Sequence, residues 1–555
     1  MTSRKHAHAH VRSTLHHARA LSVLATIASG VAPAIAQTTQ EPAWFSLWNG
    51  EANLYDHGRS ICLLPDKSVA ITGESWHTDG NWAMATSVFT PLGTLAWSSV
   101  YIGPFPGFHL DRGVDVQTDA AGHVYTLGTS SGGSRNQGGS DFDIVLIKHS
   151  PDGAILWTRR FNAPGNWSDI ATALAVDTTG RAYISGSAFY QLSDRGFFAT
   201  DFLVLGYSPE GDLDWTYHTT GPGNRGAIAR DIALGPSGDV FATGQIAGAA
   251  SGDQDFIIVR LDAHTGAPIY RTTYSTPGFN TTEDDGQHLA VDHLGQAHIV
   301  GQWMPEVTAS SPNRHRDALT IKLSPVGQVL WTATTTRDRE EQPFDIVVGT
   351  DGRVYVGGVW LNQLGNDGWI ECYSPDGQTE WTYVRGEPDN FDEEGVIGLE
   401  IGSDGHLFAC IPDEEPTPAG EEVGLVEFTP GGSVVSHRLY GAGSTTDHAW
   451  DFELAPDGSA SFGGYSYRGT ETDSDMLVLR VGGSSPSCPA DLDDGSGTGT
   501  PDAGVTIDDL LYFLDRFGVG DLAADLDDGS GTGSPDAGVT IDDLLYFLDR
   551  FNLGC

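Results

Sequence analysis

Short runs in which apolar and polar residues alternate fill the chain from about residue 42 to residue 482. Gly-containing turns separate these runs, and Asp-Gly pairs mark several of them, among them Asp152-Gly153 and Asp376-Gly377. Alternation with a period of two predicts half-buried strands, and an Asp-Gly pair predicts a hairpin turn in which both central residues have positive φ. The pattern therefore predicts an all-β domain made of antiparallel hairpins.

A longer period organises these predicted strands. The segment 113–166 is echoed by 173–224, and weaker copies begin near residues 60, 230, 287, 344, 397 and 450, which gives eight copies. Each copy predicts four strands, and the fourth often opens with a tryptophan: Trp97, Trp157, Trp215, Trp331 and Trp381. Four antiparallel strands at this period predict an eight-bladed β-propeller over residues 42–482, with seven blades and one degenerate copy as the alternative.

The two ends of the repeat array predict how the ring closes. The eighth copy stops near Gly482 without a fourth strand, and the segment that begins at Trp44 supplies an unassigned one. From Trp44 to Gly73 is 29 residues, the same spacing as from Trp157 to Gly186. The first strand is therefore predicted to complete the last blade, which removes the sheet edges that an open array would expose.

The repeat resembles bacterial extracytoplasmic propeller repeats of the SBBP or delta-60 kind. It is also distantly similar to the Trp-docking repeats of quinoprotein dehydrogenases, and LDAHTGAPIY at 261–270 and YSPDGQTEW at 373–381 carry these resemblances. The resemblance implies the fold alone, because propellers host many unrelated functions.

Two features of the repeat are candidates for ligand binding. One is an acid at the start of the third strand in seven copies: Asp143, Asp201, Asp255, Asp317, Asp367, Glu422 and Asp475. These acids either form a ring that binds a cation or substrate, or each accepts a local hydrogen bond from loop amides, which is the preferred interpretation. The tryptophans are expected to pack between blades.

The other feature is the set of variable polar loops, where a glycan or peptide ligand is expected first: 78–82, 130–140, 191–200, 247–254, 305–316, 362–367, 414–421 and 468–473.

A different pattern follows a short linker at 483–487. The 27-residue stretch from Asp491 returns 34 residues later, with Ser534 in place of Thr500 as the only change. Each copy ends in a run with helical period, in which the expected apolar face of the first copy is Ile507, Leu510, Leu511, Leu514 and Phe517. Thr506 and Asp509 have the spacing of a helix N-terminal cap. The two apolar faces are expected to pack together, since neither half has enough core alone.

The acidity of this module, residues 488–555, predicts bound metal. It holds 15 Asp against Arg516 and Arg550, a net charge of −13. Such a density of hard oxygen ligands calls for Ca²⁺, and omission of about seven residues of a Gly/Ser/Thr insert leaves the ligand spacing of an EF-hand loop. The predicted ligands of about two Ca²⁺ ions are Asp491, Asp493, Asp502, Gly504, Thr506 and Asp509, then Asp525, Asp527, Asp536, Gly538, Thr540 and Asp543.

The duplicated loop and helix resemble a dockerin. The stretches ADLDDGSGTG and PDAGVTIDDLLYFL, with Gly554-Cys555 at the end, are similar to the GC-type dockerin-like tail of secreted bacterial proteins. The resemblance implies attachment to a cohesin-like or surface scaffold protein, and the alternative is a Ca²⁺-stabilised cap without a partner. Cys488 and Cys555 bracket the module, so they either form a disulfide or leave Cys555 as a terminal attachment point.

Composition and the N-terminal segment limit the possible partners and location. Lys and Arg number 29 against 74 Asp and Glu, a formal charge of −45, which excludes nucleic acid and anionic membrane surfaces as partners. A basic start, an apolar run at 21–34 and a small-x-small site at 34–36 predict a signal peptide at 1–36, and hence a secreted or cell-surface protein. No segment is long enough for a membrane span. The fates of Cys62, Cys372 and Cys410 stay open.

These features favour a secreted, non-catalytic propeller that serves as a binding or structural platform and is attached through a Ca²⁺-dependent tail. The alternative is an extracellular polysaccharide lyase or hydrolase on the same fold, because dockerins commonly accompany such enzymes. Its catalytic groups would have to converge from different blades, which spacing along one chain cannot reveal. Enzymatic activity is therefore left open, with the non-catalytic interpretation preferred.

Overall fold

The computed structural model describes residues 38–39, 42–104, 109–134, 140–164, 167–191, 198–250, 252–276, 283–304, 315–337, 339–361, 366–385, 395–412, 422–441, 447–467, 474–482, 492, 507–527 and 538–553. The predicted signal peptide and the predicted linker lie outside these residues. Within the described ranges, no helix is long and apolar enough to cross a membrane.

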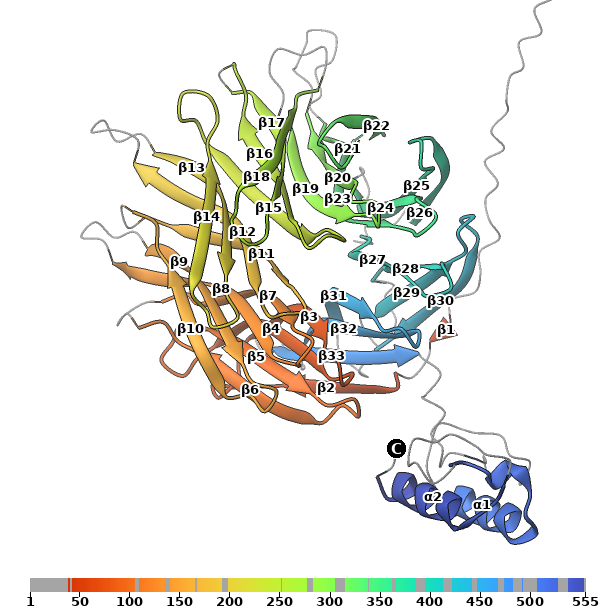
Figure 1. Cartoon of the computed structure of the whole chain (residues 1–555). Helices are drawn as coiled ribbons and strands as arrows, with labels where there is room; N and C mark the ends of the chain where they lie inside the picture. The colour runs from red at the N-terminus through yellow and green to blue at the C-terminus, as the bar shows by residue number, and fades with distance from the viewer. Residues whose placement is uncertain are drawn as a thin grey trace, which may run out of the picture. The chain divides into compact units, whose positions relative to one another are not determined.

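Eight sheets stand around a common centre, each built on four antiparallel strands, and one of them has a short fifth strand at its outer edge; the eight-bladed propeller is confirmed (Figure 1). Blades one to four are β3 (Asp56–Leu63), β4 (Val69–Trp76), β5 (Trp82–Phe89) and β6 (Leu95–Tyr101); β7 (Arg112–Thr118), β8 (Val124–Ser134), β9 (Ser140–His149) and β10 (Ile155–Phe161); β11 (Asp169–Val176), β12 (Ala182–Gln191), β13 (Phe198–Tyr207) and β14 (Leu213–Thr219); β15 (Ala227–Leu234), β16 (Val240–Ala247), β17 (Gln254–Leu261) and β18 (Pro268–Tyr274).

Blades five to eight repeat this order. They are β19 (Asp285–Val291), β20 (Ala297–Trp303), β21 (Asp317–Leu323) and β22 (Val329–Thr335); β23 (Glu340–Val348), β24 (Val354–Leu361), β25 (Asn366–Tyr373) and β26 (Thr379–Arg385); β27 (Gly398–Ile401), β28 (Leu407–Cys410), β29 (Val423–Phe428) and β30 (Val434–Tyr440); β31 (Asp447–Leu454), β32 (Ser459–Tyr467), β33 (Ser474–Gly482) and β2 (Trp44–Trp48). The first strand of each blade is innermost and contacts the first strands of both neighbouring blades.

The ring closes as the sequence predicts. β2 pairs antiparallel with β33, with Trp44 opposite Arg480 and Trp48 opposite Met476, so the first long strand completes the last blade. A short strand that the pattern does not predict, β1 (Thr38–Thr39), pairs parallel with the outer strand β30 of blade seven. The N-terminal segment thus contacts blades seven and eight.

The core lies between blades. One buried cluster joins Tyr183 and Phe202 of blade three to Val240 and Ile257 of blade four, and the next joins Phe241 of blade four to residues of blade five. Each sheet therefore buries its faces against its neighbours, as expected for a radial stack of sheets.

A girdle of aromatic side chains on the outer strands also joins the blades. Each indole N–H donates to a carbonyl oxygen in the outer hairpin turn of the next blade, over 2.8–3.1 Å, and the ring covers a glycine of that turn. The tryptophans are Trp44, Trp97, Trp157, Trp215, Trp331 and Trp381. In blade four Tyr270 takes the equivalent place against Gly327. The predicted packing of these tryptophans between blades is confirmed.

The hairpin turns differ from the predicted type. In the Asp152-Gly153 turn only Gly153 has positive φ, at 89°, and the same holds for Gly377 after Asp376, at 79°. A register shift follows each turn, between Ile155 and Trp157 in the first case. The turns are thus type I turns followed by a left-handed glycine and a bulge, because an aspartate avoids positive φ where a following glycine can adopt it.

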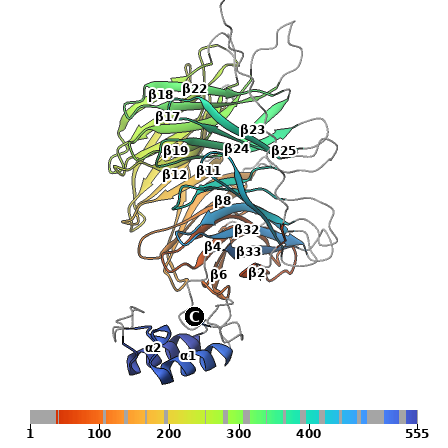
Figure 2. The same cartoon turned by 90° about the vertical axis from the view of Figure 1, so that its right-hand side faces the viewer.

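The C-terminal module contains α1 (Ile507–Val519), a 3₁₀ turn at Leu522–Ala524 and α2 (Ile541–Leu553), and the two helices lie side by side in Figures 1 and 2. Phe513 and Phe547 stack face to face between them, with ring centroids 4.1 Å apart, and both are fully buried. The predicted pair of mutually packed helices is confirmed.

We expect Trp44→Ala to lower the free energy of unfolding of the propeller by about 2–3 kcal/mol. This is less than the roughly 3–5 kcal/mol for a fully buried aromatic, because Trp44 is half-buried. The substitution removes the docking of the closing strand on blade one. Scanning calorimetry of the full chain measures the effect, with Phe45→Ala as the control, since Phe45 lies on the same strand but is exposed. Equal shifts in the two variants would contradict the role of this contact.

Candidate functional site

Four aspartates on the inner strands of alternate blades tie those blades to the next ones. Asp115 of β7, Asp231 of β15 and Asp345 of β23 accept the backbone N–H of residues on β11, β19 and β27 over 2.7–2.8 Å. Asp451 of β31 accepts the N–H of Ile61 on β3 over 2.9 Å, which joins blade eight to blade one where the ring closes. Sequence reasoning missed this set. The signal was present, since an Asp recurs at one register in every second copy.

Burial raises the pKa of these carboxyl groups. It raises the pKa of Asp115 and Asp345 to about 6, although the hydrogen bonds that they accept act in the opposite direction. It raises the pKa of Asp231 and Asp451 to about 7, where the charges of other inner-strand aspartates add to the effect. Burial, reinforced by Asp345 and Asp451, raises the pKa of Glu400 to about 8. The central channel is therefore a region where carboxyl groups hold protons near neutral pH.

The acids predicted at the start of the third strands have local partners. Asp143 pairs with Arg160 over 2.7 Å, and Asp201 lies 3.0 Å from Nδ1 of His218. Thr336 donates to Asp317 over 3.3 Å. These partners lie on or just after the fourth strand of the same blade, so each of these acids makes a local interaction, as the preferred interpretation predicted. The donors are side chains, however, rather than the loop amides that were expected. Most of the variable loops lie outside the described residues.

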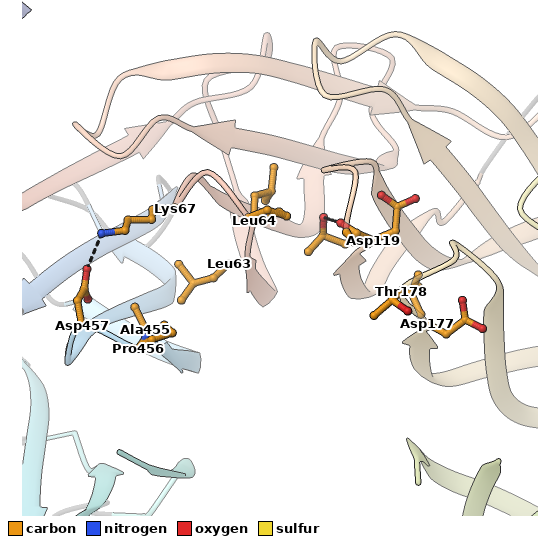
Figure 3. A pocket seen from close by; sticks show the side chains of 13 residues that line it. Leu63, Leu64, Lys67, Asp119, Asp177, Thr178, Ala455, Pro456 and Asp457 are labelled. Carbon is orange, nitrogen blue, oxygen red and sulfur yellow. Dashed lines mark hydrogen bonds and ion pairs between the residues drawn. The ribbon is translucent and has the colours of Figure 1, made fainter. Parts of the chain in front are cut away.

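A cavity of about 700 Å³ opens where the inner strands of blades eight, one, two and three end (Figure 3). Its walls are mainly apolar, with Leu63, Leu64 and Pro456 among them. Its polar groups are already engaged: Lys67 pairs with Asp457 over 3.0 Å, and Asp119 accepts backbone amides of its own turn. This end of the channel offers little chemistry for a reaction.

In the C-terminal module the structure describes six of the twelve predicted Ca²⁺ ligands, namely Asp509, Asp525, Asp527, Gly538, Thr540 and Asp543. Asp509 accepts the N–H of Leu492, and Asp543 accepts that of Leu526, each over 2.6 Å. Asp543 also accepts the N–H of Thr540 over 2.6 Å, and the Thr540 hydroxyl accepts the N–H of Asp542 at the start of the second helix. Of the capping pair predicted in the first copy, Thr506 lies outside the described residues, so that pair stays a prediction. The last acid of each loop therefore joins the loop to the start of its helix.

These carboxylates suit a hard cation in chemistry, and the structure brings them only partly together. Asp509, Asp525, Asp527 and Asp543 are buried. Burial opposes ionisation, but three backbone amides hold the pKa of Asp543 below its ordinary value. No three of the described tail carboxylates lie within 4.8 Å of one another. Asp491, Asp493, Asp502, Gly504, Thr506 and Asp536 lie outside the described residues.

The apolar face of the helices differs from the predicted one. Leu510, Phe513 and Phe517 pack inward, whereas Ile507, Leu511 and Leu514 are exposed. The second helix repeats this exposure at Ile541, Leu545 and Leu548, and the six side chains are 42–60% exposed. The helical period was predicted correctly, but each helix carries two apolar stripes and only one of them forms the core.

The described cysteines Cys62, Cys372 and Cys410 are buried free thiols. Burial raises the pKa of the Cys62 thiol, and nearby acids reinforce the effect, so its reactive thiolate form is disfavoured. The predicted disulfide between Cys488 and Cys555 lies outside the described residues.

Comparison with known proteins gives limited likenesses. No family model matches the chain. The chain is 25% identical over 292 residues to the regulatory protein FlaEY of Caulobacter vibrioides, which is 44% of this chain and 30% of that protein. The chain thus spans less than a third of the length of this curated relative.

Among solved structures, the chain is similar to Sqt1 of Chaetomium thermophilum, with a TM-score of 0.45 and 11% identity over 79% of this chain and 97% of that one. It is also similar to the polysaccharide lyase Uly1, with a TM-score of 0.43 and 12% identity over 69% and 91% of the two chains. At these values neither likeness carries a functional argument. The eight-bladed fold rests on the strand pairing of this chain.

We expect the propeller to lose stability as the pH rises from 6.5 to 8. Glu400, with a folded pKa of about 8, and Asp231 and Asp451, at about 7, have folded pKa values above their unfolded ones. The native state therefore binds more protons than the unfolded state, and stability falls by up to about 1.4 kcal/mol per pH unit for each of these groups until the pH passes its folded pKa. Burial lowers the pKa of His288 to about 4, so this group makes the propeller more stable as the pH rises from about 4 to 6.5. The effect of His288 is nearly complete at pH 6.5 and changes the stability little above it. The change of stability with pH is measured as the melting temperature of the propeller at several pH values, in buffers that contain EDTA.

Glu400→Gln should flatten this slope and stabilise the propeller more at pH 8 than at pH 5.5. The amide keeps the shape of the side chain and removes the group that must stay protonated. Glu51→Gln is the matched control, because Glu51 is exposed. A rise in melting temperature that is the same at both pH values would contradict the assignment.

Proposed function

We propose that this protein is a secreted, non-catalytic β-propeller held on a cohesin-like or surface scaffold protein by its C-terminal module, which requires about two Ca²⁺ ions. One observation carries this proposal. Two helices with the same first eleven residues, IDDLLYFLDRF, expose matching aliphatic triads while a separate stripe of each helix forms the core.

An exposed aliphatic face of this kind supports docking. Burial of aliphatic side chains in the core would stabilise such a small module, yet six of them lie outside the core. Burial of one triad under a partner would remove it from water, and the identical sequences of the two triads let either helix make the same contacts. The propeller would then be the module that is carried, with its faces available for a ligand.

The Ca²⁺ requirement is supported by the charge and by the burial of the acids. Four aspartates are buried in a module with a net charge of −13, and the one basic side chain described there, Arg516, pairs with Asp521. A divalent ion would offset the repulsion among these acids and draw each loop closed. The helices that present the exposed triads begin directly after these loops, so metal binding and docking are expected to be coupled.

The alternative of a polysaccharide-degrading enzyme needs carboxyl groups that are available for proton transfer. The four channel aspartates accept backbone N–H groups of neighbouring blades, which is a structural task. They therefore give no support to the enzymatic alternative.

We expect titration calorimetry of the full chain to show about two Ca²⁺ ions bound, and Asp543→Asn to bind about one. Asp543 closes the second loop, so the loss should be confined to that site. Asp542→Asn is the matched control, because it removes the same charge from the adjacent, exposed position and should keep both sites. Equal losses in the two variants, or no binding heat in the wild type, would contradict a built site.

We expect the immobilised full chain to capture a partner from the secreted and surface proteins of its own organism only when Ca²⁺ is present. The double variant Leu511→Glu/Leu545→Glu should abolish capture, and each single variant should retain much of it, because the other helix offers the same face. Leu330→Glu, an exposed leucine of the propeller, serves as the control. Capture that persists in EDTA or in the double variant would favour a cap without a partner.

A further inference from the structure

The inner strands carry a bulge at a shared position. In seven of the described inner strands the register shifts by one residue at this point, as between Pro343 and Asp345 of β23 and between Ala449 and Asp451 of β31. A bulge redirects one side chain out of the regular alternation. The bulged residues of β23 and β31 are Phe344 and Trp450, and both are solvent-exposed, at 39% and 49%.

These two aromatic side chains line one cavity of about 560 Å³ at the end of the channel where the inner strands begin. Ile397, which precedes the inner strand of blade seven, lies between them in the ring order and lines the same cavity. The first two strands of blade seven, β27 and β28, have four residues each, whereas the corresponding strands of the other blades have seven to eleven. This short blade leaves room between blades six and eight.

The polar groups of the cavity are amides, an imidazole and a hydroxyl. Gln342 and Asn366 contribute amides, and His448 and Tyr465 contribute an imidazole and a hydroxyl. No Asp, Glu, Lys or Arg belongs to its described lining. The guanidinium of Arg59 lies over the Trp450 ring, 5.5 Å from its centroid, and is already paired with Glu74 over 2.8 Å. The cavity therefore gives no advantage to a charged ligand.

Trp450 lies at the end of a row of aromatic rings. Its ring lies 6.5 Å from that of Tyr465, which in turn lies 4.7 Å from the ring of His448 and 4.4 Å from that of His57 in blade one. Two exposed aromatic rings on a rigid support, with amide and hydroxyl groups beside them, form a typical ligand-binding arrangement in size and composition.

We propose that this cavity binds a neutral oligosaccharide. The apolar C–H face of a pyranose ring matches the exposed aromatic surface of Trp450 and Phe344, and its hydroxyl groups match the amide donors and acceptors of Gln342 and Asn366. Neutral sugar is favoured over acidic sugar because no Lys or Arg is among the described lining residues and the chain carries a charge of −45. The proposal does not depend on the C-terminal module, since every lining residue belongs to the propeller.

The test uses the full chain and three defined probes: the hexasaccharides of β-1,4-linked glucose, mannose and xylose, followed by an array of neutral polysaccharides. We expect saturable binding of at least one neutral glycan, seen by calorimetry and by tryptophan fluorescence. Trp450→Ala and Phe344→Ala should each weaken it by about tenfold or more, and Trp450→Phe should weaken it less. Phe45→Ala, an exposed aromatic outside the cavity, should leave it unchanged.

Several outcomes would overturn the proposal. One is the absence of binding to every neutral glycan in the set. Another is unchanged affinity in Trp450→Ala and Phe344→Ala variants that keep the wild-type melting temperature; if either fails to fold, Gln342→Ala and Asn366→Ala replace it. Preferential binding of peptides from a peptide array at the same residues would assign the cavity to a protein partner. By contrast, glycan binding that persists in EDTA would support a site in the propeller that does not need the metal-dependent tail.

Discussion

Contact between neighbouring blades is the interaction on which the rest of this propeller depends. A four-stranded sheet has two faces and can bury neither of them alone, so each blade needs a neighbour on both sides. The chain joins neighbouring blades at two distances from the centre of the ring. Aromatic side chains on the outer strands bind the turn of the next blade, and aspartates on the inner strands bind its backbone amides. The core clusters between the blades fill the space between the inner and the outer contacts.

The inner ties alternate around the ring, and electrostatics explains the alternation. Asp115, Asp231, Asp345 and Asp451 belong to every second blade, whereas the same register in the intervening blades holds Ser60, Ala173, His288 and Gly398. Eight carboxyl groups around one channel would repel one another more strongly than four, and their desolvation cost would double. The structural unit of this propeller is therefore a pair of blades, although the sequence repeat is a single blade.

The sequence allowed prediction of the features that depend on local or periodic patterns. The four strands of each copy, the count of eight and the closing role of the strand at Trp44 all follow from the spacing of the repeat. The channel aspartates were missed because their shared register matters only when strands from different blades lie side by side. The exposed face of the tail helices was assigned wrongly because periodicity identifies two apolar stripes, and only the stacking of Phe513 on Phe547 decides between them. The cavity beside Trp450 arises from the shortness of β27 and β28, which pattern analysis treats as ordinary strands.

The pairing of β2 with β33 also shapes the order in which this chain can fold. The strand at Trp44 leaves the ribosome 436 residues before its partner at Arg480. At roughly 5–20 residues per second of synthesis, the early strand waits for tens of seconds with an unsatisfied edge. During that interval the last blade of another molecule offers the same hydrogen bonds, so crowded nascent chains risk exchanging this strand and joining as a swapped pair.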